Sequence, residues 1–195
     1  MKNHVPSVAL LYGLGCFSTP ALAAPDSPTP PAEVSPAPLV RFDVEVDPLA
    51  YVALGHSLHV GLSVARFRFD IGTFSATVPE FLHRQPGFDN VMSGYGAKLD
   101  VFVWQVDRGP FVGVEGAWIR EQIRDDSTHI ETRTQSWIAG GRLGWHFALP
   151  AHFYIKPWVG VGYRFGRESV TVGKRVFHQT PLSLFPTFHV GYVFE

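Results

Sequence analysis

The chain has 195 residues, which is enough for about one domain, with 46% hydrophobic residues and only 17% charged ones. Its formal net charge of -1 gives no reason to expect a nucleic-acid partner, because such partners usually require a strong basic excess. No internal run of about 18 apolar residues exists, so neither a membrane-spanning helix nor a helical bundle is expected.

The first 39 residues have the composition of an export signal followed by a linker. Lys2 precedes an apolar stretch over 8–17, and Ala21 and Ala23 fit a small-x-small cleavage site. We therefore predict a signal peptide over residues 1–23. Residues 24–39 are rich in proline and are expected to form an extended periplasmic linker.

The only cysteine, Cys16, lies inside the predicted signal peptide. In "GLGC" it could indicate lipid attachment, but Gly13 stands where a lipoprotein signal usually has leucine. With the signal removed, the mature chain has no cysteine, so neither disulfides nor thiol catalysis are expected.

From residue 40 onward, apolar residues recur at every second position, which is the period of a half-buried strand. In 136–147 the apolar face includes Trp137 and Leu143, whereas Arg142 and His146 lie on the other face. The pattern predicts seven strands, at 40–53, 57–71, 92–104, 110–121, 136–147, 153–165 and 183–194.

The connections between these strands alternate in length. Residues 107–110 and 149–152 are short turns rich in Gly or Pro, whereas 72–91, 122–134 and 166–182 are long. Short turns on one side and long loops on the other are typical of a transmembrane barrel. We predict an all-β fold, a closed antiparallel transmembrane up-and-down barrel over 40–195.

Parity of the crossings predicts eight strands, with the missing one either in 166–182, where "SVTVGKRVF" could form a hairpin, or in the N-terminal part of 39–54. Closure is required because an unpaired strand edge in hydrocarbon costs several kcal/mol per backbone group. The alternative is a soluble sandwich or lipocalin-like barrel, which would turn its apolar faces inward and its charges outward.

The end of the chain resembles a known group. Val190, Tyr192 and Phe194 alternate and finish in an aromatic residue, although Glu195 adds one residue after it. With the barrel pattern, this ending resembles the small eight-stranded outer-membrane barrels of Gram-negative bacteria, of the OmpA, OmpX and OmpW types. The resemblance implies an outer-membrane location, outer-membrane lipid and lipopolysaccharide as surroundings, recognition by the barrel assembly machinery, and a monomer.

Charged residues fall on the face opposite the apolar stripes. The inward set comprises Arg41, Asp43, Glu45, Asp47, Lys98, Asp100, Glu115, Arg142, Lys156 and Arg164. It holds five charges of each sign, and buried charges must be paired or hydrated. We predict a lumen filled by ion pairs, with Lys98, Asp100, Glu115, Arg142, Lys156 and Arg164 as the main candidates. The alternative is a narrow water-filled pore.

Histidines in "GHSLHVG" suggest two chemistries. His56 and His59 would face opposite sides of a strand, so one metal cannot bind both. His56 beside Ser57 is similar to the His-Ser pair of outer-membrane lipid A deacylases, but Leu58 breaks that motif. We expect these residues to form a strand end and a periplasmic turn.

Two of the long connections differ in polarity. The sequence "VPEFLHR" in 72–91 predicts a short helix after Pro79 that covers the barrel rim, and the polar loop 122–134 is expected to be extracellular. We predict a non-enzymatic outer-membrane barrel with a role in envelope structure or surface interaction, without catalytic residues, metal or cofactor. The alternatives are a lipid A-modifying hydrolase and a narrow small-solute channel.

Overall fold

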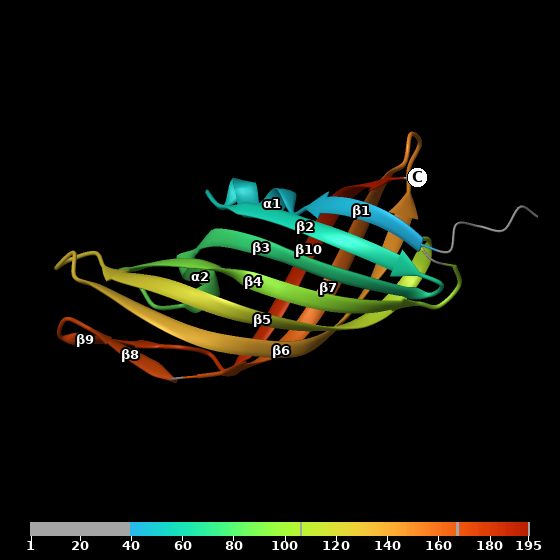
Figure 1. The fold of residues 1–195 in the computed structure, drawn as a ribbon. Helices are drawn as coiled ribbons and strands as arrows, with labels where there is room; N and C mark the ends of the chain where they lie inside the picture. The colour runs from blue at the N-terminus through green and yellow to red at the C-terminus, as the bar shows by residue number, and fades with distance from the viewer. Residues whose placement is uncertain (1–39, 106, 167, 195) are drawn as a thin grey trace, which may run out of the picture. The chain divides into compact units, whose positions relative to one another are not determined.

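A computed structural model describes residues 40–105, 107–166 and 168–194. Eight antiparallel strands close into a barrel in the order β1-β10-β7-β6-β5-β4-β3-β2 (Figure 1). The predicted all-β barrel of eight strands is therefore confirmed. The signal peptide and linker predicted for 1–23 and 24–39 lie outside the described residues.

The barrel strands differ in length: β1 and β2 are the shortest, and β5 and β6 are the longest. They are β1 (Val40–Val46), β2 (His56–Val64), β3 (Phe67–Val78), β4 (Phe88–Phe102), β5 (Gly109–Asp125), β6 (Glu131–Ala148), β7 (Phe153–Phe165) and β10 (Leu182–Phe194). Two further strands, β8 (Ser169–Val172) and β9 (Arg175–His178), form a separate hairpin. The helices are α1 (Pro48–Val52) and α2 (Glu80–His83). In the part of the chain that the structure describes, no helix is long and apolar enough to cross a membrane.

The prediction that the eighth strand lies in 166–182 or 39–54 was wrong. The segment 57–71 is not one strand but β2 and the start of β3, joined by a turn at Ala65 and Arg66 in which Ala65 adopts φ 53°. The eighth barrel strand is thus β3. Residues 166–182 do contain the expected hairpin, but it forms a separate two-stranded sheet and is not a strand of the barrel.

The strand predicted for 40–53 also ends early, at Val46. The Asp47 side chain accepts a hydrogen bond from the Leu49 N–H at 2.8 Å, and Pro48 opens the first helical turn. A side-chain cap and a proline at the first helical position both favour a helix start. The local sequence therefore begins α1 where alternation alone suggested more strand.

The long connections are shorter than predicted. The expected loop 72–91 shrinks to 79–87, where α2 forms directly after Pro79 as predicted. The expected loop 122–134 shrinks to 126–130, because β5 and β6 extend into it. A turn among the short connections was expected around His56 and Ser57. The structure differs, because β2 begins at His56 at the end of the barrel that carries the long connections.

The pleat separates polar from apolar residues as predicted. Leu143 points outward with 60% of its surface exposed, whereas its neighbour Arg142 points inward and is 4% exposed. Val161 and Tyr163 are outward and exposed, and Lys156 is buried in the lumen. The core of this fold is therefore the polar interior of the barrel.

Candidate functional site

The lumen holds one connected set of charged side chains, which we call the lumen network. It comprises Asp43, Glu45, Arg68, Asp70, Lys98, Asp100, Arg142 and Lys156, with Tyr154, His59 and His189 bonded to it. Strand alternation aims these side chains inward from β1, β2, β3, β4, β6, β7 and β10. The network thus ties together strands far apart in the sequence.

Arg68 is the hub of the network. Its Nη2 atom lies 2.5 Å from Asp43 Oδ1, 3.1 Å from Glu45 Oε2 and 3.1 Å from Asp70 Oδ2. Its Nε atom donates to Asp43 Oδ2 at 3.0 Å, so the guanidinium grips that carboxylate with two parallel bonds. One cation therefore joins the acids of β1 and β3.

A second bidentate pair lies across the lumen. Arg142 donates to both oxygens of Asp100, from Nε at 2.9 Å and from Nη2 at 2.7 Å. Lys156 joins the two halves, because its Nζ lies 2.8 Å from Glu45 Oε2 and 3.7 Å from Asp100 Oδ2. The Tyr154 hydroxyl lies 2.7 Å from Asp43 Oδ1 and 2.8 Å from Glu45 Oε2.

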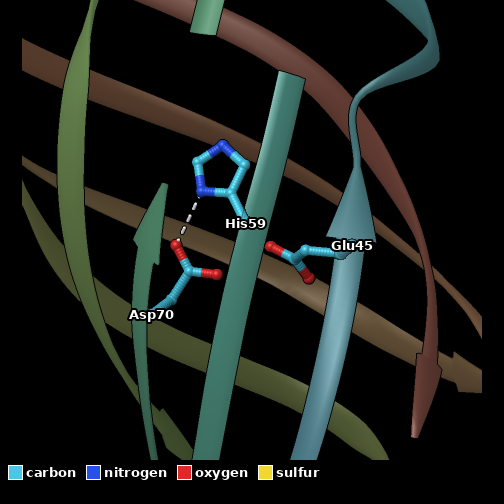
Figure 2. Close-up of side chains that lie close together, drawn as sticks. All are labelled: Glu45, His59 and Asp70. Atoms are coloured by element: carbon cyan, nitrogen blue, oxygen red, sulfur yellow. Dashed lines mark hydrogen bonds and ion pairs between the residues drawn. The ribbon is translucent and has the colours of Figure 1, made fainter. Parts of the chain in front are cut away.

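Figure 2 shows the part of the network with the donor types of a metal site: Glu45, His59 and Asp70. One ligand-type atom from each lies within 4.8 Å of the others, and His59 Nδ1 is 2.9 Å from Asp70 Oδ1. The same carboxylates already face cations, however, since Lys98 Nζ lies 3.4 Å from Asp70 and 3.7 Å from Glu45. Because side chains supply the positive charge, the arrangement gives no reason to add a divalent cation.

The charges of the lumen network balance, and the network is sealed from solvent. It contains four acids (Asp43, Glu45, Asp70, Asp100) and four bases (Arg68, Lys98, Arg142, Lys156). The side chains in its ion pairs are between 0% and 8% exposed. These side chains are enclosed by protein, so each charge has to be compensated by its neighbours.

Inward glycines make room for the network. A Cβ atom at Gly61 would lie 2.3 Å from Asp43 Oδ2, and one at Gly113 would lie 2.4 Å from Asp100 Oδ1. A Cβ at Gly191 would lie 2.2 Å from the Tyr154 ring. On β10 the inward glycine Gly191 therefore leaves space, and the Tyr154 side chain of β7 extends into it.

A smaller polar group lies nearer the loops, which we call the loop-end group: Arg164, Glu121, Ser136 and Gln179. Arg164 Nη1 donates to Glu121 Oε2 at 2.6 Å and to Ser136 Oγ at 2.8 Å. The Gln179 amide also donates to Glu121. A cavity of about 250 Å³ borders Arg164 and Gln179, so this group meets solvent.

The β8–β9 hairpin forms an apolar cluster with the inward-facing residues at the loop ends of β4 and β5. Its buried members are Phe88, Ile123, Val170, Val172 and Phe177. Arg175 fixes the hairpin from outside, donating to the carbonyls of Pro86 and Gly87 and lying 4.1 Å from the Phe88 ring centroid.

Arg175 also lies 3.4 Å from Asp125, at the loop end of β5. Hydrogen bonds, first from the Ser127 side chain and then from the N–H groups of Ser127 and Thr128, lower the pKa of Asp125 to about 2. The loop end therefore has its own ionised group.

The remaining predicted lumen residues lie at the edges of the network. Glu115 is half-buried opposite Lys98 in the β4–β5 register. Arg41 lies 3.5 Å from Asp107 near the short turns, and Asp47 accepts a hydrogen bond from Thr187. The predicted lumen residues thus lie in three places: the lumen network with its edge, the loop-end group and the barrel rims.

The hub itself was not among these predicted residues. Arg68 and Asp70 were missed because an unbroken strand over 57–71 puts them on the same face as Leu58 and Val60. The signal was present: outward apolar residues fall on even numbers up to Val64 and on odd numbers from Phe67. Such a change of phase requires a turn between the two runs.

The hydrolase alternative depended on His56. In the structure His56 Nδ1 lies 2.9 Å from Ser75 Oγ, not beside Ser57, which is buried on the inner face. The other ring nitrogen lies 3.4 Å from the Thr73 hydroxyl. Within the described residues no carboxylate is bonded to His56, so the group that orients the histidine in a Ser-His-acid triad has no counterpart here.

No protein-family model and no curated protein sequence matches the chain. Among solved structures it is similar to Neisserial surface protein A, with 14% identity, a TM-score of 0.50, and coverage of 79% of this chain and 94% of that one. It also matches the N-terminal β-barrel domain of Pseudomonas aeruginosa OprF (12% identity, TM-score 0.45, 80% and 96% coverage). A third match is a major outer membrane protein from Thermus thermophilus (15% identity, TM-score 0.44, 80% and 99% coverage). In fold, this chain resembles the small eight-stranded outer-membrane barrels, as its sequence indicated.

Proposed function

We propose that this chain spans a bacterial outer membrane as a closed, non-conducting barrel and serves envelope structure or surface interaction without enzymatic activity. One observation carries the proposal: exposed apolar residues surround an interior of almost fully buried ion pairs. A soluble barrel would reverse this arrangement, since burial of apolar surface drives folding in water.

Aromatic residues on the outer surface support a membrane location. Tyr95, Trp118, Trp137 and Phe165 are successive register partners across β4, β5, β6 and β7, so they form one row across these four strands. A second group lies toward the short turns, where Trp104 contacts Trp145 and Phe153 contacts Tyr192. Two aromatic girdles that flank an apolar band are typical of membrane barrels.

The height of the band fits an outer membrane. Trp137 and Phe147 are ten residues apart on β6. At about 3.3 Å per residue and a tilt of about 40°, this separation spans about 25 Å, which is the height of the apolar band in such barrels.

The connections suggest an orientation. Both ends of the barrel, at Val40 and Phe194, lie on the same side as the short connections 103–108 and 149–152. Short turns face the periplasm in outer-membrane barrels. We therefore place the β8–β9 hairpin on the cell surface beside lipopolysaccharide, and the C-terminal strand where the barrel assembly machinery would meet it.

The first experiment tests the membrane assignment. The full chain is refolded in lipid vesicles and run on a gel with and without heating, together with Leu143→Arg and Gln122→Arg. We expect a heat-sensitive folded band for the wild type. Leu143→Arg should lower the free energy of unfolding in urea by about 2–4 kcal/mol, because a charge at the bilayer midplane is costly. Gln122→Arg, on the exposed outward face of β5 nearer the loops, should behave like the wild type. Recovery in the aqueous phase with no shifted band would overturn the assignment.

The second experiment tests the closed lumen. The folded protein is added to a planar lipid bilayer, and current is recorded in salt solution. We expect no steady channel currents, since the ion pairs of Arg68, Arg142 and Lys156 fill the interior. Reproducible single-channel steps from heat-modifiable protein would support the small-solute channel instead.

A further inference from the structure

We propose that residues 48–55, which comprise α1 and the turn after it, form a lipid-facing part of the barrel wall that packs against acyl chains of the outer leaflet. This inference rests on the membrane location proposed above. It assigns a partner to a segment that topology alone would place among the surface loops in water.

The segment lies where the strand wall is incomplete. β1 pairs with β10 only from Phe42–Phe194 to Val46–Val190, yet β10 continues along β7 as far as Leu182. Beyond Val46 the place of β1 in the wall is taken by α1, which extends past the end of β1 alongside β2 (Figure 1).

Both flanking strands hold α1 in this gap. On one side the Tyr51 hydroxyl donates to the carbonyl of Ser57 on β2 at 2.9 Å. On the other side the helix cap, Asp47, accepts a hydrogen bond from Thr187 on β10 at 2.7 Å. Ala50 is the buried residue of the helix. The helix is therefore part of the wall, with one side toward the barrel and one side away from it.

The outer side of the segment is strongly apolar. Leu54 is 88% exposed and Val52 is 79% exposed, and residues 48–55 include no charged side chain. The neighbouring wall has the same character, because Leu58 on β2 and Leu184 on β10 are also exposed. The segment thus continues the apolar outer surface of the barrel without interruption.

Most backbone N–H groups of the segment have a hydrogen-bond acceptor. Leu49 donates to the Asp47 side chain, and Ala53, Leu54 and Gly55 donate to the carbonyls of Leu49, Tyr51 and Ala50, respectively. The carbonyl of Ala53 accepts from Thr77 of β3 at 2.8 Å. Each such hydrogen bond lowers the cost of surrounding the backbone with hydrocarbon.

The height of the wall requires such a segment. β1 has seven residues, which at about 3.3 Å per residue and a tilt of about 40° covers about 18 Å of the roughly 25 Å apolar band. A polar loop above β1 would leave this side of the barrel too short for the membrane. The apolar helix supplies the missing height.

The loop at 126–130 gives the contrast. It connects β5 and β6, which have 17 and 18 residues and extend well beyond the band, and it reads "DSTHI". The long strands β5 and β6 thus have a mainly polar connection, whereas the short strand β1 is followed by an apolar one. This difference between the two connections is expected if the surroundings of 48–55 are lipid.

The test measures the surroundings of single labels. In a Cys16→Ser background, Leu54→Cys, Val161→Cys and Lys174→Cys are each labelled with an environment-sensitive fluorophore in vesicles of phosphatidylcholine. Val161 marks the outward face of β7, and Lys174 marks the exposed tip of the β8–β9 hairpin. Quenching by lipids with a nitroxide on the acyl chain is compared with quenching by iodide in water.

We expect the Leu54 label to behave like the Val161 label, with strong quenching by the lipid nitroxide and several-fold weaker quenching by iodide than at Lys174. A Leu54 label quenched like Lys174, with Val161 still in lipid, would overturn this inference and leave the membrane barrel intact. A Val161 label in water would instead overturn the proposed function. Val52→Cys replaces Leu54→Cys if the latter gives no heat-modifiable band.

Discussion

The two polar groups inside the barrel use the same chemistry at different depths. In the lumen network Arg68 is fully buried and touches three carboxylates. In the loop-end group Arg164 is partly exposed and pairs with a single carboxylate, that of Glu121. Arg68 is fully enclosed by protein, whereas Arg164 borders a cavity of about 250 Å³.

This difference teaches that position in the lumen, more than the number of ion pairs, decides what each pair does. A buried pair is weak support for net stability, but breaking it is strongly destabilising because a charge remains uncompensated. The Arg164–Glu121 pair is also largely buried, but Glu121 keeps hydrogen bonds from Asn90 and Gln179 if the arginine is lost. The lumen network should therefore specify how the strands close, while the loop-end group should mainly position the hairpin.

The largest expected effect is from Arg68→Met. It removes the cation shared by Asp43, Glu45 and Asp70 and should lower the free energy of unfolding by at least about 3–5 kcal/mol. The matched variant Arg164→Met should cost less, about 1–3 kcal/mol, because Asn90 and Gln179 still donate hydrogen bonds to the Glu121 carboxylate. Urea titration of the heat-modifiable band measures both.

Equal losses for Arg68→Met and Arg164→Met would break the comparison. If Arg68→Met gives no folded band, the double variant Arg68→Met with Asp43→Leu decides the matter. Removing both members of a buried pair should recover part of the folded band, since less uncompensated charge remains.

The next largest effect is from Gly61→Ala in the lumen. Its new methyl group would lie 2.3 Å from Asp43 Oδ2 and 2.5 Å from Arg68 Nη2, so it should cost about 1–3 kcal/mol by overpacking. Gly116→Ala on β5 is the control, because the nearest atom to its new methyl group is 3.9 Å away. A Gly61→Ala barrel as stable in urea as the Gly116→Ala barrel would contradict tight packing of the network.

At the loop end, Phe177→Ala should loosen the hairpin and leave the barrel closed. Phe177 is buried and its ring lies 5.4 Å from the Phe88 ring in an edge-on contact. We expect faster trypsin cleavage at Lys174 and a loss of no more than about 1 kcal/mol in barrel unfolding, because the strands retain their own pairs. Val176→Ala, on the exposed side of β9, should leave the cleavage rate unchanged.

Much of the barrel could be predicted from the sequence because lipid and lumen impose opposite demands on alternate residues. Leu143 and Arg142 illustrate this, since each is on the face that its chemistry requires. The partners could not be predicted in the same way. Asp43 and Tyr154 are 111 positions apart, and only the register and tilt of the closed barrel bring them to 2.7 Å.

The boundaries that failed have physical reasons. β5 and β6 were cut short because residues such as Gln122 and Arg124 lie outward where the wall leaves the membrane, and a strand in water needs no apolar outer face. The turn at Ala65 and Arg66 was hidden because it includes neither glycine nor proline. Only the change of phase between β2 and β3 marks it.

The smallest expected effect separates the loop end from the lumen by pH. Asp125 has its pKa lowered to about 2 by hydrogen bonds from Ser127 and Thr128 and by Arg175, against an ordinary value near 3.9. A depressed folded pKa contributes stability that is complete above about pH 4 and is lost as the pH falls toward about 2. Hairpin protection from pepsin should therefore decline over that range in the wild type. In Asp125→Asn the protection should be weaker at pH 5 and should show less of this decline. The variant Asp126→Asn also removes one loop charge and should keep the wild-type profile. If Asp125→Asn and Asp126→Asn give the same profile, the hairpin is held by its apolar cluster alone, and the ionised group at the loop end does not contribute to its docking.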